Sequence, residues 1–138
     1  MSWSTSPRSA RLDAMAEALS VLVVDDNKDA ADALAALLDA QGFAASAAYS
    51  GAAAIRQAEQ THPHVVLLDI GMPGTSGFDV ARALRDYRRA PKPVIVAVTG
   101  AADRSDRLAA RMAGFDHYLV KPVEVGALVS LLEKLAAR

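Results

Sequence analysis

The chain has 138 residues, 52% of them hydrophobic and 22% charged, and its formal net charge at pH 7 is −1. This balance gives no basic surface for nucleic acid, and the absence of cysteine excludes disulfides and thiolate metal sites. No apolar stretch approaches the roughly 18 residues that span a bilayer. We therefore expect a cytoplasmic domain with a buried core that binds neither nucleic acid directly nor membrane.

Residues 1–19 are expected to form an N-terminal extension, and residues 20–138 the folded domain. Residues 1–9 are rich in Ser and Pro, which is typical of a loose tail. A short helix is expected next, with apolar residues at the spacing of one helix face, namely Leu12, Met15, Ala16 and Leu19. This helix would either dock on the domain or serve as a linker.

Five apolar runs predict the strands, at residues 21–24, 43–48, 65–68, 94–98 and 117–120. Unbroken apolar runs fit strands that are buried on both faces, as in a parallel sheet covered by helices. The run of small residues at 43–48 is weaker and is expected at the edge of the sheet.

Helical patterns separate these strands, at residues 28–41, 52–60, 78–89, 103–113 and 124–136. Gly42 and Gly114 follow two of them as helix stops. Strands that alternate with helices predict right-handed βαβ units. The expected fold is therefore α/β, a doubly wound five-stranded parallel sheet with the strand order 2-1-3-4-5.

Polar residues end four of the five strands. They are Asp25 and Asp26 after the first, Asp69 after the third, Thr99 after the fourth and Lys121 after the fifth. Each residue alone is more often a cap or turn residue. Four such coincidences at one edge of a sheet are much less probable than one, so a ligand-binding crevice is the favoured interpretation.

The charges in this crevice predict its chemistry. Three carboxylates within a few ångströms repel by about 4 kcal/mol per pair at an effective dielectric near 20, so at least one carboxyl pKa should rise unless a cation binds. Oxygen ligands suit Mg²⁺ or Mn²⁺. A divalent cation beside a lysine and a hydroxyl is a site for a phosphoryl group, with Asp69 as the in-line nucleophile.

On these residues the sequence resembles the receiver domain of two-component response regulators, over about residues 21–136, which has the flavodoxin/CheY-like (βα)5 fold. The resemblance implies a signalling switch, not an ordinary enzyme, which takes a phosphoryl group from a histidine kinase or histidine phosphotransfer protein with Mg²⁺. It makes Asp69 the phosphoacceptor and Asp25 and Asp26 the acidic pair, and it implies that Gly71 offers its backbone carbonyl to the metal. Thr99 would be the switch hydroxyl and Tyr118 the aromatic residue that rotates on activation. Lys121 and Pro122 match the Lys-Pro pair of the family, which usually has a cis peptide. In this family, the domain promotes its own phosphorylation and dephosphorylation.

Two surfaces are expected to meet partners. The first helix presents short side chains beside the acidic pair, where the family meets the phosphohistidine helix bundle of a kinase: Ala30, Ala31 and Ala33. The helix at 103–113 carries a basic stripe of Arg104, Arg107 and Arg111. That stripe is either a solvated face or a contact for an acidic downstream protein or a second receiver.

Other functions fit less well. A haloacid-dehalogenase-like Mg²⁺-dependent phosphatase usually has a second Asp two residues after the first, where this chain has Gly71, and no cap insertion is present. A nucleotide site at Gly71, Gly74 and Gly77 lacks a following Gly-Lys-Ser/Thr element. A purely structural domain would not need Asp69, Thr99 and Lys121 together. We expect either a free-standing regulator or a receiver from a hybrid kinase or multidomain protein.

Overall fold

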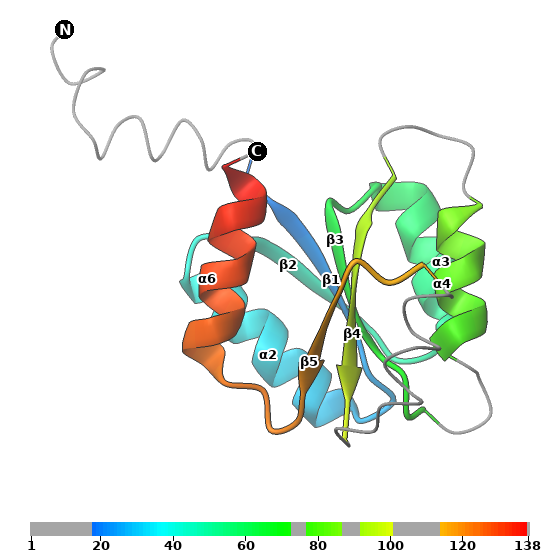
Figure 1. The fold of residues 1–138 in the computed structure, drawn as a ribbon, viewed down its shortest axis with the longest axis horizontal. Coiled ribbons are helices and arrows are strands. Elements are labelled where there is room, and N and C mark those ends of the chain that lie inside the picture. The colour runs from blue at the N-terminus through cyan, green and yellow to red at the C-terminus, as the bar shows by residue number, and fades with distance from the viewer. Residues whose placement is uncertain (1–17, 73–76, 87–91, 101–113, 138) are drawn as a thin grey trace, which may run out of the picture.

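The computed structural model describes residues 18–72, 77–86, 92–100 and 114–137, and the structural statements below concern these residues. Its strands are β1 (Ser20–Val24), β2 (Ala44–Ala48), β3 (Val65–Asp69), β4 (Val94–Thr99) and β5 (His117–Val120). Its helices are α2 (Lys28–Ala40), α3 (Gly51–Thr61), α4 (Gly77–Arg85) and α6 (Val125–Ala136) (Figure 1). The helix expected at 103–113 and almost all of the N-terminal extension lie outside this part of the chain.

The five strands form one parallel sheet in the order β2-β1-β3-β4-β5, which confirms the predicted topology. Val24 pairs with Leu68 between β1 and β3, and Thr99 pairs with Val120 between β4 and β5. This register brings the carboxyl ends of β1, β3, β4 and β5 to one edge of the sheet, at the bottom of Figure 1. The residues that follow these strands therefore start from neighbouring positions.

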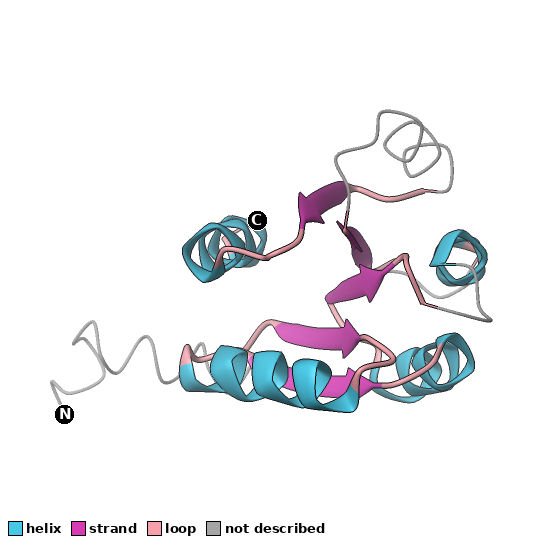
Figure 2. Cartoon of the chain, turned by 90° about the horizontal axis from the view of Figure 1, so that it is seen from below, coloured by secondary structure: helices cyan, strands magenta, loops and turns pink. Residues whose placement is uncertain are grey.

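Helices cover both faces of the sheet, with α2 and α6 on one side and α3 and α4 on the other (Figures 1 and 2). Leu22 and Leu68 face α3 and α4, whereas Val23 and Leu67 face α2 and α6. Because successive strand side chains alternate between two buried faces, β1 and β3 are apolar at nearly every position.

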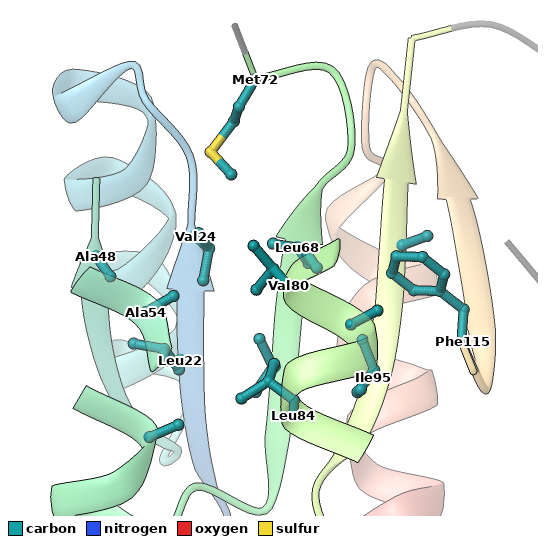
Figure 3. Close-up of a cluster of buried hydrophobic side chains, with 14 residues drawn as sticks. Leu22, Val24, Ala48, Ala54, Leu68, Met72, Val80, Leu84, Ile95 and Phe115 are labelled. Atoms are coloured by element: carbon teal, nitrogen blue, oxygen red, sulfur yellow. The ribbon is translucent and has the colours of Figure 1, made fainter. Parts of the chain in front are cut away.

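The core between the sheet and α3 and α4 contains Leu22, Leu68, Val80, Leu84 and Ile95, all fully buried (Figure 3). Each such side chain contributes about 1.5–3 kcal/mol when it leaves water. Gly77 begins α4 against this layer, and a Cβ atom there would lie 2.7 Å from the Cα of Ile70. Glycine therefore allows α4 to start directly beside the loop that follows β3.

Local signals set the helix ends. The side chain of Asn27 caps α2 by accepting a hydrogen bond from the N–H of Ala30, and Ser50 caps α3 in the same way with Ala53. Gly42 follows α2 with a φ of 99°, a conformation that favours glycine and stops the helix as predicted. In the described part of the chain, no helix is long and apolar enough to cross a membrane.

Candidate functional site

Three carboxylates meet at the carboxyl edge of the sheet. Asp25 and Asp26 follow β1, Asp69 ends β3, and one oxygen from each lies within 4.8 Å of the others. Asp69 is buried, Asp25 is half-buried and Asp26 is exposed. They meet because β1 and β3 are neighbours in register, as the sequence pattern predicted.

Both carboxylate oxygens of Asp69 accept hydrogen bonds. Oδ1 accepts from the N–H of Gly71 at 2.8 Å, and Oδ2 accepts from Nζ of Lys121 at 2.8 Å. A Cβ atom on residue 71 would lie 3.4 Å from Oδ1, so glycine leaves that side of the carboxylate open. The two hydrogen bonds therefore hold the buried carboxylate in a fixed orientation.

Burial raises the pKa of Asp25 above its usual 3.8, although the N–H of Asn27, which donates to Oδ1 at 3.0 Å, opposes the rise. The charge of Asp69 raises this pKa further and that of Lys121 lowers it. The predicted rise of a carboxyl pKa agrees in direction, but desolvation is the largest cause and repulsion is a smaller one.

Lys121 is the cation of the site. Its hydrogen bond to Asp69 raises its pKa above 10.5, partial burial opposes the rise, and the charges of Asp69, Asp25 and Asp26 add to it. The backbone N–H of Lys121 donates to the carbonyl of Thr99 at 2.7 Å, and the peptide bond to Pro122 is cis. This backbone bond links the end of β4 to the start of the β5–α6 loop.

Thr99 and Tyr118 lie on adjacent strands. Thr99 is buried at the end of β4, two residue pairs along the register from the pairing of Ala97 with Tyr118. Tyr118 is half-buried and packs against the core that faces α3 and α4. The described residues that line the cleft above the carboxylates do not include Thr99. The switch roles of these two residues therefore stay predictions.

The cleft continues from the carboxylates onto an apolar wall. Its lining includes Asp25, Asp26, Asp69 and Lys121, and then the side chains of the neighbouring helix and loop, Ala30, Leu34, Pro122 and Val123. The acidic end and the apolar end thus belong to one surface between α2 and the β5–α6 loop.

The structure corrects one of the three alanines that were expected to face a partner. Ala30 and Ala33 are exposed, but Ala31 is fully buried with Ala35 and Leu38. Positions 31, 35 and 38 share one face of a helix, and this face packs on the sheet. Ala31 is therefore a core residue. Arg104, Arg107 and Arg111, the expected basic stripe, lie outside the described residues.

The sequence pattern missed a group of polar side chains next to this site. Lys28 and Asp32 on α2 both contact Tyr49, which follows β2 at the same edge of the sheet. Ala48 and Tyr49, at the end of the second strand, carry no charged group, so the strand-end pattern does not indicate a role for Tyr49. Only the i, i+4 spacing of Lys28 and Asp32 on one helix face could have indicated part of this group.

Comparisons with known proteins place the chain in a family. The family profile described as "Response regulator receiver domain" matches residues 21–133. The transcriptional regulatory protein PrrA of Mycobacterium leprae is 39% identical over 118 residues, which are 86% of this chain and 50% of PrrA. The chain spans about half the length of the curated relatives that it matches.

Solved structures share the fold. The chemotaxis protein CheY4 of Vibrio cholerae has a TM-score of 0.80 at 24% identity, and the match covers 86% of this chain and 98% of CheY4. A second match is the co-crystal structure of the Saccharomyces cerevisiae histidine phosphotransfer protein Ypd1 with the receiver domain of its downstream response regulator Ssk1. That match has a TM-score of 0.79 at 26% identity and covers 87% of this chain and 90% of the matched chain. The chain therefore belongs to the response regulator receiver domain family and is a CheY-like, phosphorylation-dependent switch.

Proposed function

We propose that Asp69 is the phosphoacceptor of this receiver and takes its phosphoryl group from a histidine kinase or a histidine phosphotransfer protein. One observation carries the proposal: Asp69 is buried, bonded to Lys121 and Gly71, and within 4.8 Å of two further carboxylates. A carboxylate that served only as a cap would not need this surrounding set of charges.

The donor set fits Mg²⁺ or Mn²⁺. Carboxylate oxygens of Asp25, Asp26 and Asp69 converge, and the carbonyl of Gly71 is the further ligand that we propose. All-oxygen ligation of this kind suits small, hard cations that keep several bound waters. When bound, such a cation would offset negative charge on the phosphoryl oxygens.

Side chains of this protein carry out the phosphoryl transfer and bind its product. A carboxylate oxygen of Asp69 attacks the phosphorus, the new O–P bond forms as the P–N bond of the donor breaks, and the electron pair leaves with the donor imidazole. Lys121, which holds Oδ2 in the unmodified protein, then pairs with a phosphoryl oxygen. We propose that Thr99 binds another of these oxygens.

The exposed face of α2 is the proposed docking surface for the phosphodonor. Ala30 lines the cleft and Ala33 is exposed nearby, so another helix could approach the carboxylates closely. The match to a receiver crystallised with a histidine phosphotransfer protein supports a donor of that kind. Because PrrA is named a transcriptional regulator, an output on DNA is proposed only for longer forms that contain such a receiver.

The test is phosphorylation of the purified protein. With acetyl phosphate and Mg²⁺, intact mass should show one added phosphoryl group on the wild type and none on Asp69→Asn. Asp79→Asn, which changes an exposed carboxylate on α4, is the matched control and should be labelled normally. Equal labelling of Asp69→Asn would contradict the assignment.

Two observations argue against the phosphatase alternative. The family match is to receiver domains, and residue 71, where such phosphatases usually have a second aspartate, is glycine.

A further inference from the structure

A second charged group lies beside the proposed metal site. The hydroxyl of Tyr49 donates a hydrogen bond to Oδ1 of Asp32 at 2.5 Å, and Nζ of Lys28 lies 5.0 Å from the centre of the Tyr49 ring. Lys28 and Asp32 come from the first turns of α2, and Tyr49 follows β2. These contacts join the start of α2 to the β2–α3 loop.

Lys28 lies close in sequence to the acidic pair. It is two residues after Asp26, and its flexible four-carbon stem carries a full positive charge. An ammonium at this position would be attracted to three clustered carboxylates. In the described part of the chain, however, its ammonium forms no ion pair with them, and the cation paired with Asp69 is that of Lys121.

Tyr49 explains where Lys28 goes instead. The face of an aromatic ring attracts a cation within about 6 Å of its centre. The bond to Asp32 fixes the ring, and the carboxylate of Asp32 adds negative charge on the same side of α2. This bond is also the largest cause that raises the pKa of Tyr49 above 10.0. Among the described residues, the exposed large hydrophobic side chains are those of Tyr49 and Val125, and the contact with Lys28 gives the exposed Tyr49 ring a role.

We propose that Tyr49 and Asp32 are positioning residues that hold Lys28 away from Asp25, Asp26 and Asp69, so that its ammonium does not compete with the divalent cation. The inference rests on the metal site of the proposed function. It adds that the cation affinity of this receiver depends on an aromatic residue that is not a ligand.

The test is a Mg²⁺ titration of four proteins, followed by the amide chemical shifts of Asn27 and Gly71: wild type, Tyr49→Leu, Lys28→Met and the double variant. Tyr49→Leu should weaken Mg²⁺ binding about three- to tenfold, because the released ammonium can reach the carboxylates. Lys28→Met should bind within about twofold of the wild type, since the ammonium of Lys28 forms no ion pair with the carboxylates and physiological salt screens its remaining charge effect. The double variant should match Lys28→Met.

Each other outcome overturns the inference. Unchanged affinity in Tyr49→Leu would mean that Lys28 does not need to be held. A loss in Tyr49→Leu that Lys28→Met does not restore would show that Tyr49 acts by supporting the loop itself. If Lys28→Met bound Mg²⁺ much more tightly than the wild type, the Lys28 ammonium would already compete with the cation in the wild type. If the wild type itself bound no Mg²⁺, the metal site of the proposed function would fail, a result distinguishable from all three.

Discussion

Lys121 Nζ lies 2.8 Å from Oδ2 of Asp69, although the two residues are 52 positions apart and come from the ends of strands that are not neighbours. β4 separates β3 from β5, so the lysine side chain reaches across the end of β4 to the carboxylate. Asp69 is the more buried partner, with 8% of its side chain exposed against 42% for Lys121. The pair thus supplies a buried carboxylate with a cation that remains accessible to solvent.

Lys121→Met should destabilise the Mg²⁺-free protein by about 1 kcal/mol, because Asp69 would be left buried without its cation, while the exposure of Lys121 limits the effect. Added Mg²⁺ should restore more stability to this variant than to the wild type, since the ammonium no longer opposes the bound cation. Urea unfolding with and without Mg²⁺ measures both effects. Lys92→Met, which changes an exposed lysine before β4, is the control. If Mg²⁺ raised the unfolding free energy equally in the wild type, Lys121→Met and Lys92→Met, the prediction would be contradicted.

Asp26→Ala should stabilise the Mg²⁺-free protein and remove its Mg²⁺ affinity. Removing one of three clustered carboxylates relieves repulsion of about 1 kcal/mol, the value for a pair near water. Asp29→Ala removes the same charge from the first turn of α2, where an acidic residue favours the helix dipole, and should instead destabilise slightly. Urea unfolding and Mg²⁺ titration test both variants. Unchanged Mg²⁺ affinity in Asp26→Ala would show that Asp26 is not a ligand.

The raised pKa of Asp25 predicts a pH dependence. A carboxyl whose pKa is higher in the folded than in the unfolded state favours folding while it is protonated, and this contribution is lost as the pH rises through the folded-state pKa. Asp25→Asn in Mg²⁺-free protein should therefore gain stability relative to the wild type as the pH rises above 3.8, up to a plateau beyond the folded-state pKa. Urea unfolding across this range measures the difference. If the difference in stability between Asp25→Asn and the wild type did not change with pH, burial would not raise the pKa of Asp25.

Protonation of Asp25 should also weaken Mg²⁺ binding at low pH. Protonated Asp25 cannot serve as a ligand, so Mg²⁺ affinity should fall at a higher pH than an ordinary aspartate would cause. Affinity that stayed constant down to pH 3.8 would contradict this prediction.

The fold and the acidic centre could be predicted because their signals are local and repeated. β1 and β3 are apolar on both faces, and Asp25 directly follows β1 while Asp69 is the last residue of β3. Parallel register then brings the two residues together without any knowledge of side-chain packing.

Other features could not be predicted for a physical reason. α2 contains six alanines, and alanine suits a buried and an exposed position almost equally, so the pattern did not show that Ala31 faces the core while Ala30 does not. The contact between Asp32 and Tyr49 depends on how a loop meets a helix 17 positions away. No periodicity within one element reports such a contact.

Ala30→Arg should slow phosphoryl transfer from a cognate kinase or phosphotransfer protein about tenfold or more, because a long charged side chain would stand where a partner helix approaches. Labelling by acetyl phosphate should stay close to the wild-type rate, since a small donor needs no docking surface. Ala36→Arg, an exposed position six residues further along α2, is the control and should affect neither reaction. Equal slowing by both donors would show that Ala30→Arg damages the site itself.

Phosphorylation of Asp69 should reach Tyr118 by way of Thr99. A phosphoryl group on Asp69 adds nearly two negative charges and strong acceptor oxygens. Thr99 ends the neighbouring strand β4, and Tyr118 lies on β5 beyond it, half-buried against the core that faces α3 and α4. If Thr99 moves toward the phosphoryl group, space opens that the Tyr118 ring can fill by becoming more buried.

Beryllofluoride with Mg²⁺, which imitates the phosphoryl group, should therefore shift the amide resonances of Thr99 and of β5 around Tyr118. A complete change from 1:99 to 99:1 would need about 5.5 kcal/mol of differential stabilisation, so we expect a partial population shift. Thr99→Ala should keep the shifts near Asp69 but reduce those around Tyr118, because we propose that the Thr99 hydroxyl links the two. Thr61→Ala, which removes a hydroxyl at the far end of α3, is the control. Shifts confined to the loops that hold Asp26, Asp69 and Lys121 would show that phosphorylation does not reach Tyr118.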